Sequence, residues 1–229
     1  MRITVYDFDD TLFCTTHFQS TLQKVKQTMS ISDLLVGKLP EELVFENLAK
    51  SVLDLLNFSM KTSDKVMIIT NATKDWVEGI FDDHLPGCTE LKNKVELFSC
   101  HALDTNMCKW KTKGFEMVLG KYFENGKHQL ISIGDSYLDR LAALHIQEKY
   151  PNVVVKHVKL QDQPSVKDIL QQHIAIKLYL PILVEKWAHC DELLVKISEN
   201  HYFISPYQEN IPSMFGAPVV LGKEQEVSC

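Results

Sequence analysis

The chain has 229 residues, 45% of them hydrophobic and 24% charged, and its formal net charge is -6. This length suits one α/β domain, with or without a helical appendage, and the composition is that of a globular protein in water. The acidic balance argues against a nucleic-acid partner, because affinity for nucleic-acid phosphates rests largely on Lys and Arg. Arg2 and Arg140 are the only arginines, so lysine supplies most of the positive charge.

The N-terminal residues run directly into a strand pattern and then an acidic cluster, which is not the pattern of a signal peptide. The longest apolar stretches, such as Tyr179 to Val184, are much shorter than the roughly 20 residues that cross a bilayer. We therefore expect no transmembrane segment and a cytoplasmic location.

Apolar, β-branched runs alternate with amphipathic stretches of helical period up to about residue 160. The expected strands are Ile3–Tyr6, Val66–Ile69, Val95–Phe98, Leu130–Ile133 and Val153–Val155. The expected helices are Glu41–Leu56, which follows Pro40, and Lys74–Phe81, Gly114–Tyr122 and Tyr137–Lys149. This alternation predicts an α/β fold with a doubly wound, mainly parallel sheet. In such sheets ligands bind beyond the carboxyl ends of the strands.

The pattern changes after residue 160. Pro164–Gln172 and Ala175–Ser198 are interpreted as two helices, and Pro181 could interrupt the second. We assign residues 1–160 to a catalytic core and 161–229 to a C-terminal helical extension with an irregular tail. The extension could brace the core, cover a sheet edge or form a partner surface. The tail contains four aromatic residues that we expect to pack on the domain: Tyr202, Phe203, Tyr207 and Phe215.

Two acids, Asp7 and Asp9, follow the first expected strand, with Thr11 next at the same spacing. Alternation along a strand would point both carboxylates to one side. At about 4 Å, with an effective dielectric near 20, their repulsion is about 4 kcal/mol. A cation between them, or protonation of one, would relieve it. Both conditions suit phosphoryl transfer, which needs a nucleophile, an acid and a metal. Taken alone, the cluster also fits an acidic turn.

Asp135 and Asp139 follow the strand Leu130–Ile133 and Gly134, at a spacing that places both on one helix face. Carboxylate oxygens suit Mg²⁺, whereas no His or Cys cluster has the spacing of zinc ligands. The alternative is a helix cap in which Asp135 caps and Asp139 is solvated.

Thr70 and Asn71 end another expected strand, and a hydroxyl with adjacent amides there could hold a phosphoryl oxygen or form an ordinary turn. Lys109, Lys111 and Lys113 open the helix before the Gly134-Asp135 strand. One ammonium among the acids would neutralise them and a phosphate, although most lysines are solvated surface residues.

These four elements, in this order, resemble the haloacid dehalogenase-like (HAD) superfamily of aspartate-nucleophile hydrolases. The motifs are Asp7-x-Asp9-x-Thr11, Thr70, a lysine, and Gly134-Asp135-Ser136-x-x-Asp139, and the similarity covers residues 1 to about 160. The resemblance implies a HAD-like Rossmannoid core.

The resemblance also implies a role for each motif residue. Asp7 would attack phosphorus and form an aspartyl-phosphate, while Asp9 would protonate the leaving group and then activate water. Thr70 would hydrogen-bond a phosphoryl oxygen, and Lys111 is the preferred motif lysine, with Lys109 and Lys113 as alternatives. The expected phosphate contacts are Thr11, Thr70, Asn71 and Lys111.

The implied cofactor is Mg²⁺. Asp7 and Asp135 would ligate it directly, and Asp9 through its backbone carbonyl. Asp139 would either ligate it through water or position the lysine. The expected metal-site residues are therefore Asp7, Asp9, Asp135 and Asp139.

In the resemblance, the presence of a carboxylic acid at position 9, Asp9, favours phosphatase activity over the activity of dehalogenase-type relatives. About 60 residues separate Asp7 from Thr70, and fewer separate Thr70 from Lys111, so neither gap holds a large cap domain. We therefore expect a capless or minimally capped site open to a phosphorylated protein side chain, with phosphotyrosine as a candidate.

Thr70-Asn71-Ala72 with Trp76-Val77 is also similar to uncharacterised eukaryotic-type HAD proteins. A looser likeness is to HAD phosphatases that intracellular bacterial pathogens deliver to the host cytosol.

Other classes of enzyme lack their motifs here. No cysteine is followed at the required spacing by arginine, no G-x-S-x-G elbow occurs, and the glycines of a Rossmann or P-loop nucleotide site are missing. The remaining alternatives are a catalytically weak HAD-fold scaffold, a small-metabolite phosphatase and a phosphotransferase.

Overall fold

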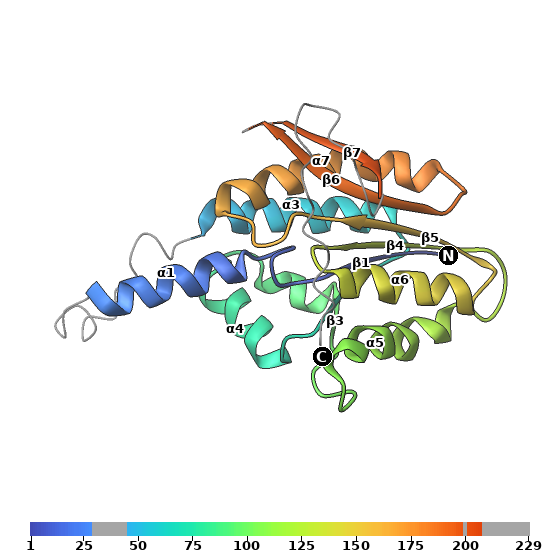
Figure 1. Ribbon diagram of the computed structural model, residues 1–229, viewed down its shortest axis with the longest axis horizontal. Helices are drawn as coiled ribbons and strands as arrows, with labels where there is room; N and C mark the ends of the chain where they lie inside the picture. Colours follow the sequence, from blue (N-terminus) through green and yellow to red (C-terminus); the bar gives the residue numbers. More distant parts are fainter. Residues whose placement is uncertain (29–44, 199–200, 208–229) are drawn as a thin grey trace.

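A computed structural model of the chain describes residues 1–28, 45–198 and 201–207. These residues form one sheet of seven strands with six α-helices (Figure 1). The strands are β1 (Arg2–Tyr6), β2 (Lys65–Thr70), β3 (Glu96–Ser99), β4 (His128–Gly134), β5 (Val153–Lys159), β6 (Cys190–Ser198) and β7 (His201–Pro206). The helices are α1 (Thr15–Thr28), α3 (Glu46–Thr62), α4 (Lys74–Asp83), α5 (Trp110–Leu119), α6 (Tyr137–Lys149) and α7 (Val166–Glu185). Short 3-10 turns are η2 (Thr89–Asn93), η3 (Met107–Lys109) and η4 (Gly120–Tyr122).

The strand order is β3-β2-β1-β4-β5-β6-β7, and every pairing is parallel except that of β6 with β7. The order reverses direction between β1 and β4, which is the topological switch point where α/β sheets bind ligands. Tyr6 pairs with Ile68 on one side and Ile133 on the other. The residues that follow β1, β2 and β4 therefore emerge side by side.

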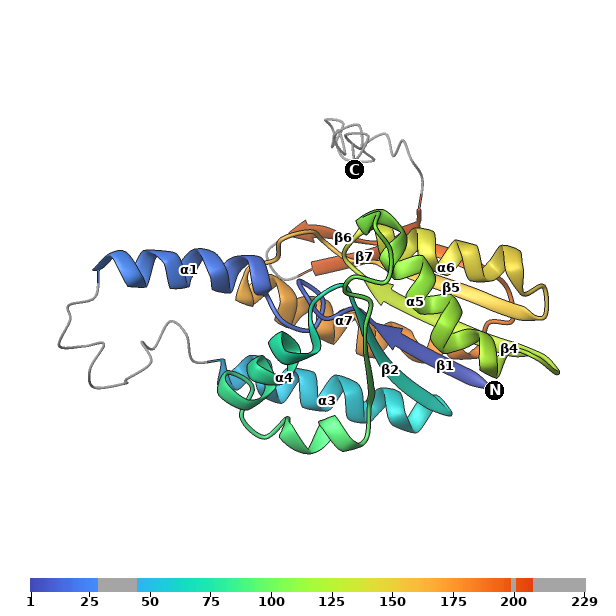
Figure 2. The ribbon, with the colours of Figure 1, turned by 90° about the horizontal axis from the view of Figure 1, so that it is seen from below.

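Helices cover both faces of the sheet. One face packs on α5 and α6 through a core that includes Phe115 and Ile146. The other packs on α3, α4 and α7 through a core that includes Leu56, Phe81 and Leu180. Figure 1 shows β1, β4 and β5 between α3 and α7 on one side and α5 and α6 on the other, and Figure 2 shows α1 projecting away from the sheet. This arrangement confirms an α/β fold with a mostly parallel sheet and is consistent with a Rossmann-like fold.

All five predicted strands are observed: four lie within observed strands, and Val95–Phe98 is observed one residue later, as β3. The helix predicted at Tyr137–Lys149 has those bounds. The helix predicted at Gly114–Tyr122 is observed as α5, which begins at Trp110 and ends at Leu119, and η4 follows it. The helix predicted at Glu41–Leu56 is observed as α3, and its first residues, with Pro40, lie outside the described residues.

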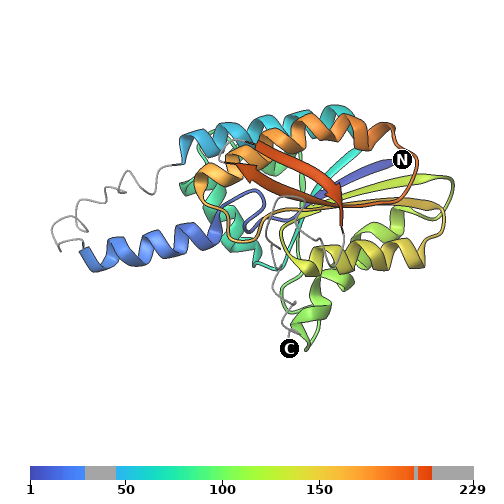
Figure 3. The same ribbon diagram turned by 45° about the horizontal axis from the view of Figure 1, so that its top comes forward.

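The prediction for the C-terminal part is wrong in two respects. The helix expected to reach Ser198 ends at Glu185, and β6 and β7 follow, adding two strands beyond β5 (Figure 3). The two expected helices are instead one helix, α7, which continues through Pro181. Of the tail aromatics, Tyr202 packs against the core and Phe203 is 52% exposed, while Phe215 lies outside the described residues.

The connection through α7 differs in hand from the others. The β4–α6–β5 and β5–α7–β6 connections step the same way along the sheet, but α6 and α7 lie on opposite faces. The two crossovers therefore have opposite hands, although parallel crossovers are right-handed in about 98% of cases. The side-by-side packing of α7 on α3 holds α7 on this face (Figure 3).

No described helix combines the length and the hydropathy that a membrane span requires.

A tight turn joins β4 to α6. Ser136 caps α6 in a capping box with Asp139, each side chain bonding the other's backbone N–H. Gly134 ends β4 against this box, and a Cβ at Gly134 would lie 2.4 Å from Cγ of Asp139. The glycine is therefore required by the close approach of the Asp139 carboxylate.

We predict that Gly134→Ala lowers the free energy of unfolding by about 1–3 kcal/mol, because the new methyl group overpacks the turn. Urea denaturation measures the change. Gly79→Ala is the control, since nothing lies within 4 Å of a Cβ at this position in α4. That substitution should raise stability by about 0.5–1 kcal/mol. A Gly134→Ala protein as stable as the wild type would contradict the packing argument.

Candidate active site

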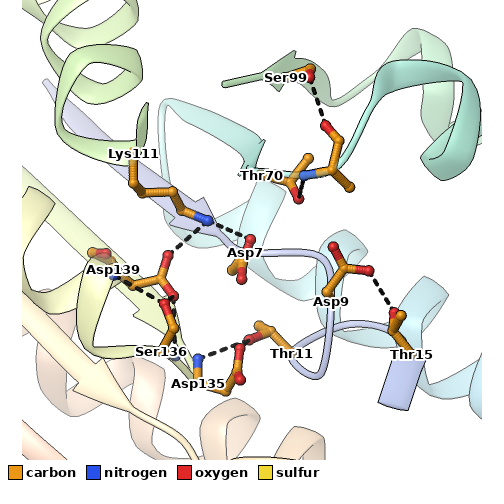
Figure 4. Close-up of polar contacts among 12 residues, drawn as sticks. Asp7, Asp9, Thr11, Thr15, Thr70, Ser99, Lys111, Asp135, Ser136 and Asp139 are labelled. Atoms are coloured by element: carbon orange, nitrogen blue, oxygen red, sulfur yellow. Dashed lines mark hydrogen bonds and ion pairs between the residues drawn. The ribbon is translucent and has the colours of Figure 1, made fainter. Parts of the chain in front are cut away.

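Three carboxylates meet at the carboxyl ends of β1 and β4. Asp7 follows β1, where its backbone N–H donates to the Ile133 carbonyl at 2.9 Å, and Asp135 follows β4. Asp139 comes from the first turn of α6. One oxygen from each of the three lies within 4.8 Å of the others (Figure 4). The sheet thus places acids from distant parts of the sequence at its switch point.

Lys111 joins this cluster from α5. Its Nζ lies 2.5 Å from Oδ1 of Asp7 and 2.8 Å from Oδ1 of Asp139, and the residue is 2% exposed. Lys109 and Lys113 are exposed, and Lys113 pairs with Asp104. Of the three candidate lysines, the structure brings Lys111 to the acids.

Negative charge exceeds positive charge in this buried site. Burial, and then the nearby Asp139 charge, raise the pKa of Asp7 to about 7, against the opposing effect of Lys111. Burial, and then Asp7 and Asp139, raise the pKa of Asp135 well above its usual value. Burial lowers the pKa of Lys111, but Asp139 and Asp7 outweigh this and raise it overall. An additional cation would relieve the remaining repulsion.

The donor atoms fit a hard divalent cation such as Mg²⁺, because they are carboxylate oxygens. Asp135 has one carboxylate oxygen bonded to Thr11 at 3.2 Å. Asp139 is already engaged at both oxygens, since Oδ1 faces Lys111 and Oδ2 accepts from the Ser136 N–H and hydroxyl at 3.2 and 2.6 Å. Of the two roles predicted for Asp139, the geometry favours positioning the lysine.

Thr11 links the first acidic motif to the second. Its hydroxyl donates to Oδ1 of Asp135 at 3.2 Å and accepts from the Asp135 N–H at 3.1 Å. Its carbonyl lies 2.8 Å from Nε2 of the buried His173 in α7. The hydroxyl predicted to contact phosphate is therefore engaged on both sides by Asp135.

Thr70 and Asn71 lie at the end of β2, and Figure 4 shows Thr70 on the opposite side of Asp7 from Asp139. The fully buried Thr70 hydroxyl accepts from the Ala72 N–H at 3.0 Å, which leaves its proton available for donation. Oδ1 of Asn71 is buried and has no hydrogen-bond partner within the described ranges. Both side chains thus retain hydrogen-bonding capacity.

Asp9 does not join the converging carboxylates. Its Oδ1 accepts from the Thr15 hydroxyl at 2.6 Å and from the Trp76 indole N–H at 3.1 Å. The expectation that Asp7 and Asp9 point to one side rested on strand alternation, but β1 ends at Tyr6. The chain then turns, with the Phe8 carbonyl accepting from the N–H groups of Leu12 and Phe13 and with Asp10 at a φ of 52°. The predicted metal contact of the Asp9 carbonyl stays a prediction.

No local sequence pattern marks Thr15, Trp76 or His173 as neighbours of the site. Each lies on a helix that follows or packs on the motif loops. A contact between side chains of different elements produces no pattern in a short stretch of sequence. Ser136 belongs to the motif Gly134-Asp135-Ser136-x-x-Asp139, and its S-x-x-D spacing is a capping-box signature that indicates its contact with Asp139.

No protein-family model matches this chain, and no curated protein matches its sequence.

We predict that Mg²⁺ raises the thermal midpoint of the wild-type protein at pH 8 and has no such effect on Asp135→Asn. In EDTA, Asp135→Asn should melt a few degrees higher than the wild type, since one of three repelling buried carboxylates is removed; about 1 kcal/mol corresponds to roughly 2–4 °C. Asp54→Asn, which removes an exposed partner of Lys177, should keep the wild-type response to Mg²⁺. Equal responses of wild type and Asp135→Asn would contradict the site.

The raised pKa of Asp7 predicts a pH dependence of stability in EDTA. The folded-state pKa of about 7 exceeds the ordinary 3.8, so between these values the folded state binds more protons than the unfolded state. The stabilising contribution is fully present below about pH 4 and is lost as the pH rises through 7. The free energy of unfolding of the wild type should therefore fall, relative to that of Asp7→Asn, as the pH rises from about 4 to 7. Urea titrations of both proteins at each pH measure this difference. A constant or rising difference would be inconsistent with the burial of an ionisable Asp7.

Proposed function

We propose that this protein is a Mg²⁺-dependent phosphomonoester hydrolase of the HAD type, in which Asp7 is the nucleophile. The observation that carries the proposal is the Lys111 ammonium held between Asp7 and Asp139, with Asp135 alongside. A buried carboxylate paired with a cation at a switch point is an arrangement that suits phosphoryl transfer to aspartate.

Asp7 suits a nucleophile because it is nearly buried and its ion pair with Lys111 opposes the rise in its pKa that burial and Asp139 cause. Lys111 would also neutralise an oxygen of the bound phosphoryl group. Thr70 and Asn71 would hold the other oxygens. Asp7 and Asp135 would hold Mg²⁺, with the Asp9 carbonyl as the third predicted ligand. When bound, the ion supplies charge neutralisation for the transferred phosphoryl group.

The reaction would proceed in two displacements. A carboxylate oxygen of Asp7 bonds to phosphorus as the ester P–O bond breaks, and Asp9 gives its proton to the leaving oxygen. Water then attacks the phosphorus of the aspartyl-phosphate while Asp9 takes its proton. The bond from phosphorus to Asp7 breaks, and inorganic phosphate leaves.

The proposed substrate is a phosphorylated protein side chain, with phosphotyrosine as the leading candidate. Between Asp7 and Thr70 the described residues form α1, which projects outward, and α3, which packs on the sheet (Figure 2). Between Thr70 and Lys111 they form α4, η2, β3 and η3, and α4 likewise packs on the sheet. Nothing in these described inserts forms a separate lid domain, and this favours a large substrate.

We predict Mg²⁺-dependent release of phosphate from p-nitrophenyl phosphate. Asp7→Asn should lower kcat by about 10³-fold or more, because the nucleophile is lost. Lys111→Met should lower kcat/KM by about 10²–10³-fold, because a buried cation facing the phosphoryl group is removed. Lys113→Met is the matched control: this exposed lysine on the same helix pairs with Asp104, and activity should stay within about twofold. An active Asp7→Asn protein would refute the mechanism.

The substrate proposal is tested by comparing kcat/KM for a phosphotyrosine peptide, a phosphoserine peptide and a panel of phosphorylated metabolites. The open site predicts the highest value for the phosphotyrosine peptide. Activity on metabolites alone would refute the phosphoprotein substrate while leaving the aspartyl-phosphate mechanism intact.

A further inference from the structure

The Asp9 carboxylate is held by donors from two separate helices. Thr15 is the first residue of α1 and Trp76 lies in the first turn of α4, and both donate to the same oxygen, Oδ1, at 2.6 and 3.1 Å. Within the described ranges, Oδ2 of Asp9 makes no hydrogen bond or ion pair. Figure 4 shows the second oxygen pointing away from Thr15.

This asymmetry determines which oxygen can carry a proton. An indole N–H is a donor only, so the bond from Trp76 can run in one direction alone. An oxygen that already accepts from two donors is a poor site for a proton, and a protonated Asp9 would therefore carry it on Oδ2. The orientation of the carboxyl group is fixed at the same time.

Trp76 is itself held in place by its surroundings. Its ring is packed beside Phe18 of α1, with centroids 6.2 Å apart, and its backbone N–H bonds the Thr73 side chain that caps α4. Thr15 is nearly buried. The two donors are thus fixed by α1 and α4, the helices that follow the two motif loops.

We propose that Trp76, together with Thr15, is a positioning residue that presents Oδ2 of Asp9 to the leaving oxygen of the substrate. This inference rests on the proposed function, in which Asp9 donates the proton as the ester P–O bond breaks. The proton moves from Oδ2 to the leaving oxygen, and the carboxylate that remains keeps its two hydrogen bonds on Oδ1. Neither Trp76 nor Thr15 touches the reacting atoms.

The consequence is a dependence on the leaving group. A nitrophenolate leaves with little need of a proton, whereas an alkoxide leaves only if it is protonated. Misorienting Asp9 should therefore slow the hydrolysis of an alkyl phosphate much more than that of p-nitrophenyl phosphate. A merely structural role for Trp76 would slow both equally.

The test compares kcat/KM of full-length wild type, Trp76→Phe and Thr15→Val for p-nitrophenyl phosphate and β-glycerophosphate with Mg²⁺. Each variant removes one donor and keeps most of the side-chain volume. We expect a loss of about tenfold or more on β-glycerophosphate, within the range of general-acid contributions, and less than about threefold on p-nitrophenyl phosphate. Because the two variants are independent, Thr15→Val decides the question if Trp76→Phe fails to fold.

Trp110→Phe is the matched control. Its indole N–H also makes one hydrogen bond, to the Asp104 carbonyl at 2.7 Å, so the same kind of bond is lost away from Asp9. This variant should change both kcat/KM values by the same factor. Equal losses on both substrates in folded Trp76→Phe and Thr15→Val, or no loss at all, would overturn the positioning role alone. A wild type without Mg²⁺-dependent activity, or an active Asp7→Asn, would overturn the proposed function and this inference with it.

Discussion

The ion pairs of Lys111 with Asp7 and Asp139 are the interaction on which the site depends. They join α5, the end of β1 and the first turn of α6. A buried charge is tolerated only when it is paired, and removing one partner of such a pair typically costs about 3–5 kcal/mol. The sheet can bring three acids together because this ammonium lies among them. The charge that it leaves uncompensated gives the site its capacity for a further cation.

The loop after β1 divides the site into two sides. On one side Thr11 bonds Asp135 and so joins the ends of β1 and β4. On the other, Asp9 is directed toward α1 and α4. His173 of α7 supports the loop through the Thr11 carbonyl, with its other ring nitrogen 3.0 Å from the Ser51 hydroxyl. The C-terminal part of the chain, which the motifs do not explain, thus contacts the loop that bears two of the predicted functional acids.

Much of this arrangement could be predicted from the sequence, because the acids follow buried β-branched strands and parallel strands end at one edge. The identity of the lysine could not, since Lys109, Lys111 and Lys113 lie close together in the sequence, and only the orientation of α5 determines which of them faces the acids. The position of the Asp9 side chain was missed because alternation holds only inside a strand. Residues 190–198 were predicted as helix because their apolar pattern is ambiguous. Their strand state depends on the free edge of β5 and on a crossover of unusual hand, and neither is visible locally.

Trapping the phosphorylated aspartate would identify the nucleophile. Wild-type protein mixed with Mg²⁺ and p-nitrophenyl phosphate is quenched in acid within milliseconds and reduced with borohydride, which converts an acyl-phosphate to an alcohol. We expect peptide mass spectrometry to find homoserine at position 7, and only when substrate was present. Modification of a different residue, or none at position 7 during active turnover, would contradict the central claim that Asp7 carries the phosphoryl group.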